Sequence, residues 1–107
     1  MSQIRLTSSD AGKKVEMAVG DVLVISLPEN PTTGFRWTFD FLDKELFLVR
    51  NDEYTVASSS GVGGGGRRTF SLVSQKTGES QIQLKRWRDW EGNSSVRERL
   101  SFPVRIT

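Results

Sequence analysis

The sequence predicts an all-β protein in which two antiparallel sheets pack face to face. Three observations predict it: apolar residues recur with period two in several short runs, those runs are rich in β-branched and aromatic residues, and turn residues separate them. About seven such strands make an immunoglobulin-like antiparallel β-sandwich the expected architecture. The length of 107 residues, 36% of them hydrophobic, fits a single domain spanning residues 1–107.

Each strand is expected from its own pattern. Residues 22–27 form a β-branched run that Pro28 closes, and residues 35–41 carry an aromatic side chain at every odd position. From Leu100 to Ile106 every second residue is apolar, which places one face of that run against a core. Turn residues separate the runs at 20–21, 29–31, 76–78 and 91–93. The expected strands are residues 15–19, 22–27, 35–41, 46–54, 69–73, 80–84 and 96–106.

Two segments fit this scheme less simply. Leu42 and Leu46 are spaced i, i+4 and hint at a helical turn, but we expect only a connection there. If the strand over 80–84 continued, Arg86 and Arg88 would point into the core. We therefore expect pairing to end or bulge near residue 85.

Composition excludes several kinds of chemistry. The chain has no His and no Cys, so it lacks the atoms for a Ser/His/Asp triad, a thiolate nucleophile, a disulfide or a Cys/His zinc site. A carboxylate enzyme using Asp40, Asp43, Asp52 or Glu53 is the remaining enzymatic hypothesis, but no pair of them forms a recognisable constellation. We expect no enzyme, no cofactor and no metal.

Charge and hydropathy point to no membrane or nucleic-acid partner. Lys and Arg number 15 against 13 Asp and Glu, and a net charge of +2 is far from the basic field that nucleic-acid binding requires. The sequence has neither the apolar core of a signal peptide nor a stretch of transmembrane length. We expect a cytoplasmic monomer.

Three segments between the strands are unusual. In the first, residues 30–35, Pro31 fixes one backbone angle, Gly34 permits a positive φ, and two threonines present small hydroxyls. This segment is either an ordinary turn or an exposed recognition loop that is ordered before binding.

The second segment is rich in glycine. Residues 61–66 match G-x-G-x-x-G literally, but a strand pattern follows where a dinucleotide fingerprint requires a helix, so we set that match aside. The run is either a flexible linker or a contact loop whose backbone approaches a partner closely.

The third segment, residues 85–92, combines three basic side chains with two tryptophans. Such a composition is typical of interface anchors and of stacking platforms for single-stranded nucleic acid. We expect Trp37 to lie in the core and Trp90 to point outward, with Trp87 open to either position.

Together the three segments resemble the loops of the chagasin family of cysteine protease inhibitors. The family's N-P-T-T-G-F/Y motif is matched in full by residues 30–35, and its G-x-G-G motif fits 61–64 or, preferably, 63–66. Its R-P-W motif falls on Arg88, Asp89 and Trp90, with Asp89 standing where the family usually has Pro. The resemblance covers roughly residues 20–106.

The resemblance implies reversible, competitive inhibition of papain-like cysteine peptidases by three loops at one end of the sandwich. Thr32 and Thr33 would sit near the catalytic thiol, the glycine segment on the non-primed side, and Arg88 and Trp90 on the primed side. The expected peptidase-binding residues are Asn30, Pro31, Thr32, Thr33, Gly34, Phe35, Val62, Gly63, Gly64, Gly65, Gly66, Arg88, Asp89 and Trp90.

Two other functions remain open on the sequence. An immunoglobulin-like adhesion or scaffold domain accounts for the sandwich but leaves the three motifs unexplained. A single-stranded nucleic-acid-binding module would use the two tryptophans and a basic stripe. The basic residues of that stripe would be Arg67, Arg68, Lys85, Arg86 and Arg88.

Overall fold

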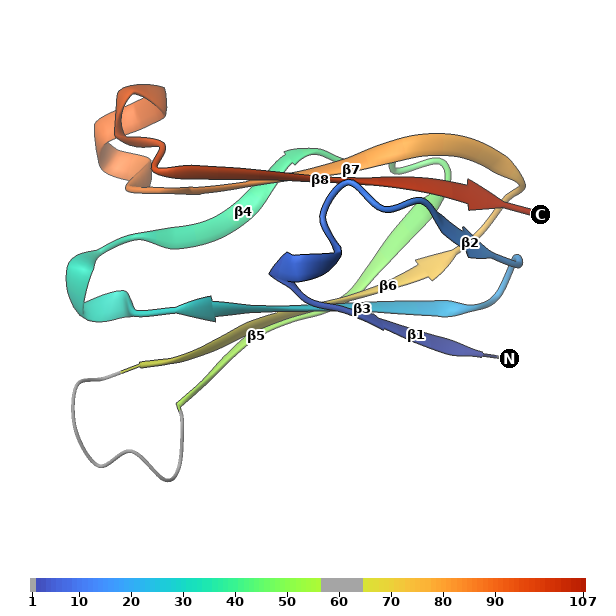
Figure 1. Ribbon diagram of the computed structural model, residues 1–107, viewed down its shortest axis with the longest axis horizontal. Helices are drawn as coiled ribbons and strands as arrows, with labels where there is room; N and C mark the ends of the chain where they lie inside the picture. The colour runs from blue at the N-terminus through green and yellow to red at the C-terminus, as the bar shows by residue number, and fades with distance from the viewer. Residues whose placement is uncertain (1, 57–64) are drawn as a thin grey trace.

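The computed structural model describes residues 2–56 and 65–107, which form a sandwich of two four-stranded sheets (Figure 1). One sheet has the order β1 (Gln3–Leu6), β3 (Val22–Glu29), β6 (Gly66–Ser74), β5 (Phe47–Val56). The other has the order β2 (Val15–Met17), β8 (Glu98–Ile106), β7 (Gly78–Trp87), β4 (Arg36–Phe41). The all-β sandwich expected from the sequence is confirmed, with eight strands in the described residues. In the same part of the chain, no helix has the length and apolar character needed to cross a membrane.

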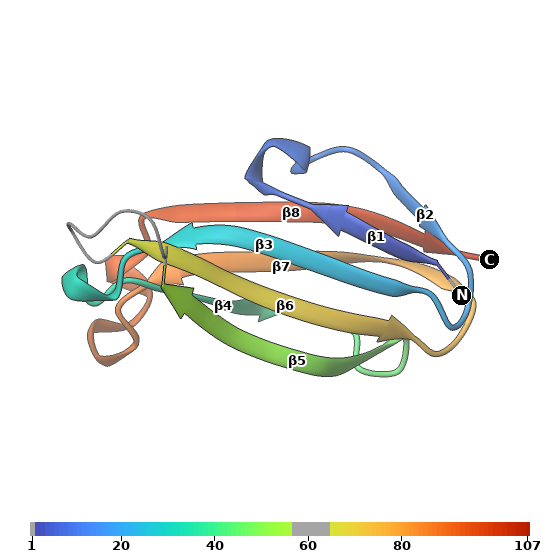
Figure 2. The ribbon, with the colours of Figure 1, turned by 90° about the horizontal axis from the view of Figure 1, so that it is seen from below.

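The prediction that both sheets are purely antiparallel is wrong. β1 pairs with β3 in parallel, and β2 pairs with β8 in parallel, while the other pairings are antiparallel. The reason is the path of the chain, which leaves the first sheet after β1, passes through β2 in the second sheet and returns as β3 (Figure 2). After this crossover β3 runs in the same direction as β1, so the two neighbours pair in parallel.

Most strand boundaries lie within a few residues of the expected ones. β1 was not expected, because four residues with two apolar positions give little alternation. Val19 lies outside β2 and is 47% exposed. β3 continues through Pro28 to Glu29, beyond the expected end. Proline fits there because β1 pairs with β3 only as far as Ile25, so the missing N–H faces no neighbouring strand.

Strand β7 also continues where we expected a break. It remains paired through Trp87, which lies opposite Arg36, so the expected end of pairing near Lys85 is wrong. A register shift does occur close by, but it lies in β4, between Phe39 and Phe41. Arg86 does lie on the inward face, but beyond the apolar core. Its guanidinium stands 5.6 Å from the ring centroid of Phe35, and its Nε lies 3.4 Å from a carboxylate oxygen of Glu98.

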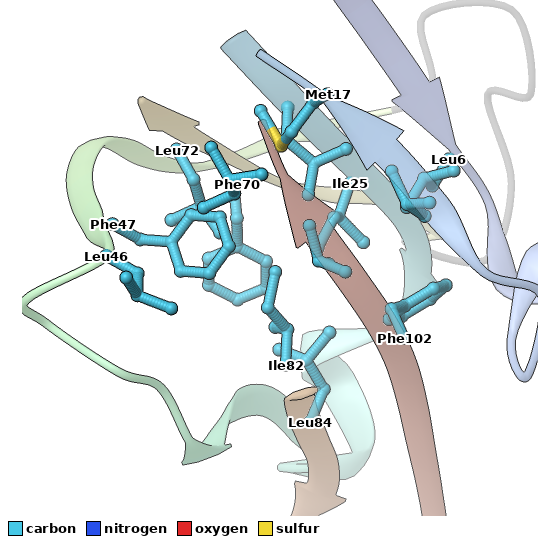
Figure 3. Close-up of a cluster of buried hydrophobic side chains, with 14 of the residues drawn as sticks. Leu6, Met17, Ile25, Leu46, Phe47, Phe70, Leu72, Ile82, Leu84 and Phe102 are labelled. Atoms are coloured by element: carbon cyan, nitrogen blue, oxygen red, sulfur yellow. The ribbon is translucent and has the colours of Figure 1, made fainter. Parts of the chain in front are cut away.

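The core fills the space between the sheets with side chains from both (Figure 3). Phe70 of β6 and Phe102 of β8 belong to opposite sheets and have 1% and 0% of their surfaces exposed, and Trp37 is buried as expected. Residues 42–46 form a turn and no helix, which agrees with the connection expected there. The fully buried side chains include Leu23, Ile25, Leu27, Phe47, Leu72, Ile82, Leu84 and Val104. Burial of this size supplies the main driving force for folding.

The connections β3–β4 and β7–β8 lie at the same end of the sandwich as the end of β5 and the start of β6, opposite the two termini (Figures 1 and 2). Strand register requires this, because Glu29 and Val56 both pair with Gly66, and Arg86 pairs with Glu98. The first and third unusual segments, and Gly65 and Gly66 of the second, therefore lie at one end.

Candidate functional site

The first of these connections, residues 30–35, is ordered by its own asparagine. Asn30 Oδ1 accepts hydrogen bonds from the amide of Thr32 at 3.1 Å and from its hydroxyl at 2.6 Å. The hydroxyl of Thr33 donates to the carbonyl oxygen of Asn30 at 2.9 Å. Asparagine favours such local bonds, and they hold Pro31–Thr33 as a 3-10 turn with both threonines exposed. The loop tip is thus a compact, uncharged turn.

Phe35 closes the first loop and is covered by arginines. Its side chain is only 7% exposed. The guanidinium carbons of Arg88, Arg97 and Arg86 lie 4.4, 4.9 and 5.6 Å from its ring centroid. Such cation–π contacts are attractive, and two of these arginines come from the third loop or its edge. Phe35 therefore joins the first loop to the β7–β8 connection.

The third connection begins at Arg88 and continues as a 3-10 segment, Asp89–Ser95. The hydroxyl of Ser95 accepts from the amide of Arg88 at 3.0 Å and lies 2.7 Å from the carbonyl oxygen of Gly92, to which it donates. Lys85 Nζ donates to Asn93 Oδ1 at 2.9 Å. Sequence reasoning missed Ser95 and Asn93, although small polar residues of this kind commonly close loops.

Arg88 connects the third loop to the first. Its Nε donates to the carbonyl oxygen of Thr33 at 3.0 Å, and its Nη1 donates to a carboxylate oxygen of Glu91 at 3.0 Å. Trp90 extends over the backbone of Gly34 and remains 68% exposed, as expected. The two loops form one projecting unit, which we call the wedge, made of residues 30–35 and 88–91.

Of the glycine segment, the structure describes Gly65 and Gly66. Val62, Gly63 and Gly64 lie outside the described residues. Gly66 begins β6, and a Cβ there would collide with the carbonyl oxygen of Thr55 and the hydroxyl of Tyr54. The last glycine of the motif is therefore required by close packing of the β5–β6 hairpin.

Two inward-facing charged residues beneath the wedge, Glu29 and Arg68, were not assigned to the peptidase-binding site from the sequence. Arg68 Nη2 lies 2.9 Å from Glu29 Oε2, and Glu29 is buried. Burial disfavours the charged form of Arg68, but hydrogen bonds to Glu29 and Asp52 outweigh it and raise the pKa of Arg68 above its ordinary value. The signal was present in the alternation, because both residues continue the inward positions of their strands. In the described ranges no group of three acidic side chains could hold a metal ion.

A compact loop tip beside an exposed tryptophan is typical of a surface that binds another protein, as the loops of protein inhibitors of peptidases are. The family model described as Chagasin family peptidase inhibitor I42 matches residues 16–106. The chain belongs to the chagasin family. It is an inhibitor of papain-like cysteine peptidases and is not an enzyme.

Known relatives agree in sequence and in structure. The chain is 34% identical to Chagasin of Trypanosoma cruzi over 102 residues, covering 91% of this chain and 92% of that protein. It is 31% identical to Amoebiasin-1 of Entamoeba histolytica, covering 86% and 89%. The crystal structure of the cysteine protease inhibitor EhICP2 from Entamoeba histolytica matches with a TM-score of 0.92 at 25% identity, covering 100% of this chain and 97% of that one.

Proposed function

We propose that the wedge and the glycine segment enter the active-site cleft of a papain-like cysteine peptidase and block it reversibly and competitively. The observation that supports this most is the hydrogen bond from Arg88 to the carbonyl oxygen of Thr33, which fixes the two loops of the wedge relative to each other. Loops ordered before binding lose little entropy in the complex, so more of the contact energy becomes affinity.

The shape of the tip explains how it resists cleavage. Pro31–Thr33 is a tight turn held by Asn30, whereas a peptidase substrate lies extended across the cleft. Thr32 and Thr33, which are exposed and uncharged, approach the catalytic thiol without offering it a scissile extended segment. The tip fills the centre of the cleft and is not processed.

The flanking residues supply the contact area. Trp90 is the anchor on the primed side, because a large aromatic side chain that is 68% exposed gains most from burial in a partner. We assign Arg88 mainly to joining the loops, and Gly63 to Gly66 with Val62 to contact on the non-primed side. An interface of about 800 Å² per partner is enough for nanomolar binding, about −12 kcal/mol.

The charges at this end do not favour the nucleic-acid hypothesis. The basic stripe that this hypothesis requires has five side chains. Four of them are paired with carboxylates, and the fifth, Arg67, donates a hydrogen bond to the hydroxyl of Ser26. Paired cations release few counterions from a nucleic acid. The four paired side chains are Arg68, Lys85, Arg86 and Arg88.

The experiment is a titration of papain activity with this protein at several concentrations of a fluorogenic peptide. We expect loss of activity at nanomolar protein, with an apparent inhibition constant that rises linearly with substrate concentration. Full activity at micromolar protein with several papain-like peptidases would refute the proposal, and an inhibition constant independent of substrate would refute its competitive form.

A further inference from the structure

One buried ion pair lies at the end of the sandwich that carries the first and third loops. Glu29 is the last residue of β3, and its side chain is fully buried, with 0% exposed. Its partner Arg68 belongs to β6 and is 11% exposed. A buried carboxylate is costly unless it is both paired and hydrogen-bonded, so the partners of Glu29 show what the carboxylate holds in place.

Those partners come from both sheets. Glu29 Oε1 accepts the backbone amide of Trp37 at 2.6 Å, and Oε2 accepts Arg68 Nε and Nη2 at 3.1 and 2.9 Å. Glu29 immediately precedes the first loop and Trp37 follows it by two residues. Arg68 follows the glycine motif by two residues. One carboxylate therefore joins both ends of the first loop to the end of the glycine segment.

Further contacts extend the network around this carboxylate. The indole Nε1 of Trp37 donates to the carbonyl oxygen of Pro28 at 2.9 Å, which adds a second bond between β4 and the end of β3. Arg68 Nη1 donates to Asp52 on β5 at 3.0 Å, and the Arg68 guanidinium lies 5.8 Å from the ring centroid of Tyr54. Directional bonds of this kind fix one geometry, whereas an apolar contact in the same place would permit sliding.

We infer that Glu29 and Arg68 are positioning residues for inhibition: their ion pair fixes both ends of the first loop relative to the start of β6, where Glu29 pairs with Gly66, and so holds the first loop in the geometry in which it enters the cleft. Glu29 is buried and does not touch the peptidase. The inference rests on the proposed function. Its physical basis is the fraction of inhibitor molecules whose loops already have the binding geometry. The ion pair keeps that fraction near one, and the apparent affinity falls in proportion when the fraction falls.

The test compares the parent protein with Glu29→Gln, which keeps the size of the side chain and an acceptor for the Trp37 amide but loses the charge opposite Arg68. We expect the inhibition constant for papain to rise about tenfold, mainly through slower association, because fewer molecules hold the loops correctly. Amide hydrogen exchange within residues 32–37 should become faster in the free variant.

A far-end variant separates positioning from general stability. Val104 is 2% exposed and pairs with Val15, away from the loops, so Val104→Ala lowers stability without touching the network. We expect it to leave the inhibition constant within twofold of the parent. The inference is overturned if folded Glu29→Gln inhibits like the parent, or if Val104→Ala weakens inhibition as much for an equal loss of stability.

A second variant and a measurement without peptidase cover the cases in which Glu29→Gln or the parent protein fails. If Glu29→Gln does not fold, Asp52→Asn removes only the outer partner of Arg68, at a side chain that is 52% exposed. We then expect the inhibition constant of Asp52→Asn to rise about threefold. The inference is overturned if both the inhibition constant and the amide exchange of this variant equal those of the parent. The exchange comparison uses no peptidase, so it tests the network even if the parent fails to inhibit, which would refute the proposed function instead.

Discussion

Gly34 and Trp90 touch across the wedge without room for a side chain between them. A Cβ placed on Gly34 would lie 2.5 Å from Trp90 Cη2 and 3.2 Å from Cζ2, and the backbone of Gly34 has a φ of +82°. Glycine is thus required twice at this position, once for the backbone angle and once for the neighbouring ring. Gly34 of the first loop therefore sets where the exposed Trp90 side chain of the third loop lies.

We expect Gly34→Ala to weaken inhibition by more than tenfold, because the methyl group must displace Trp90. The variant should also lose about 1–2 kcal/mol of stability from backbone strain. Gly20→Ala is the matched control, since Gly20 has a φ of +92° and no atom within 4 Å of the Cβ position. Equal inhibition constants for the two variants would contradict direct contact between Gly34 and Trp90 as the cause.

Trp90→Ala should weaken inhibition mainly through faster dissociation, because the side chain buries its area only in the complex. Its present exposure of 68% means that the midpoint of unfolding should hardly change. Stopped-flow measurement of both rate constants decides. Leu48→Ala, on a 54% exposed side chain of β5, should alter neither rate. An unchanged dissociation rate for Trp90→Ala would remove the proposed anchor.

Asp89→Pro should be tolerated and should tighten inhibition. Arg88 before it has φ −99° and ψ 112°, an extended conformation that a following proline favours, and residue 89 is the first of its 3-10 segment. A rigid φ reduces the entropy that the loop loses on binding, which tightens the complex. It should also stabilise the fold by about 0.4–1 kcal/mol, through the lower entropy of the unfolded chain. Asp89→Asn separates charge from rigidity in the same assay. Weaker inhibition by the proline variant would show that Asp89 itself contacts the peptidase.

Stability should depend on pH through Asp21. Hydrogen bonds from the backbone amides of Ala18 and Ser2 lower the pKa of Asp21 below its ordinary value of 3.8. Because the folded pKa is the lower one, this contribution is complete above the unfolded pKa and is lost as pH falls through the folded pKa. Urea unfolding should show Asp21→Asn less stable than the parent at pH 6, with the difference shrinking as pH falls below 3.8 and through the lowered folded pKa. A difference that does not change with pH would contradict this assignment.

Much of the fold followed from alternation, and the failures have physical causes. The run from Val22 to Leu27 and the alternating run before Ile106 predicted β3 and β8, because an inward face must be apolar along its length. Alternation does not show in which direction a strand runs relative to its neighbour. The parallel pairing of β1 with β3 and of β2 with β8 was therefore missed. The continuation of β7 was missed because an inward Arg86 was taken to be implausible, although Phe35 and Glu98 accommodate it at the open end.

The site was predictable in part. Asn30, Thr32 and Thr33 form the compact tip that their residue types favour, and Trp90 points outward. What holds the site was not predicted, because the bonds of Arg88 to Thr33 and of Arg68 to Glu29 join residues far apart in the chain. An inward charge on one strand becomes informative only when the neighbouring strand and its register are known.

Occupation of the active site by the wedge is tested by protection of the peptidase's catalytic thiol. A papain-like peptidase is saturated with this protein and then treated with a small alkylating reagent, and the rate of thiol modification is measured by mass spectrometry. Because Thr32 and Thr33 would cover that thiol in the complex, we expect modification to slow to the rate at which the complex dissociates. Modification of the bound enzyme at the rate of the free enzyme would contradict occupation of the active site by the wedge.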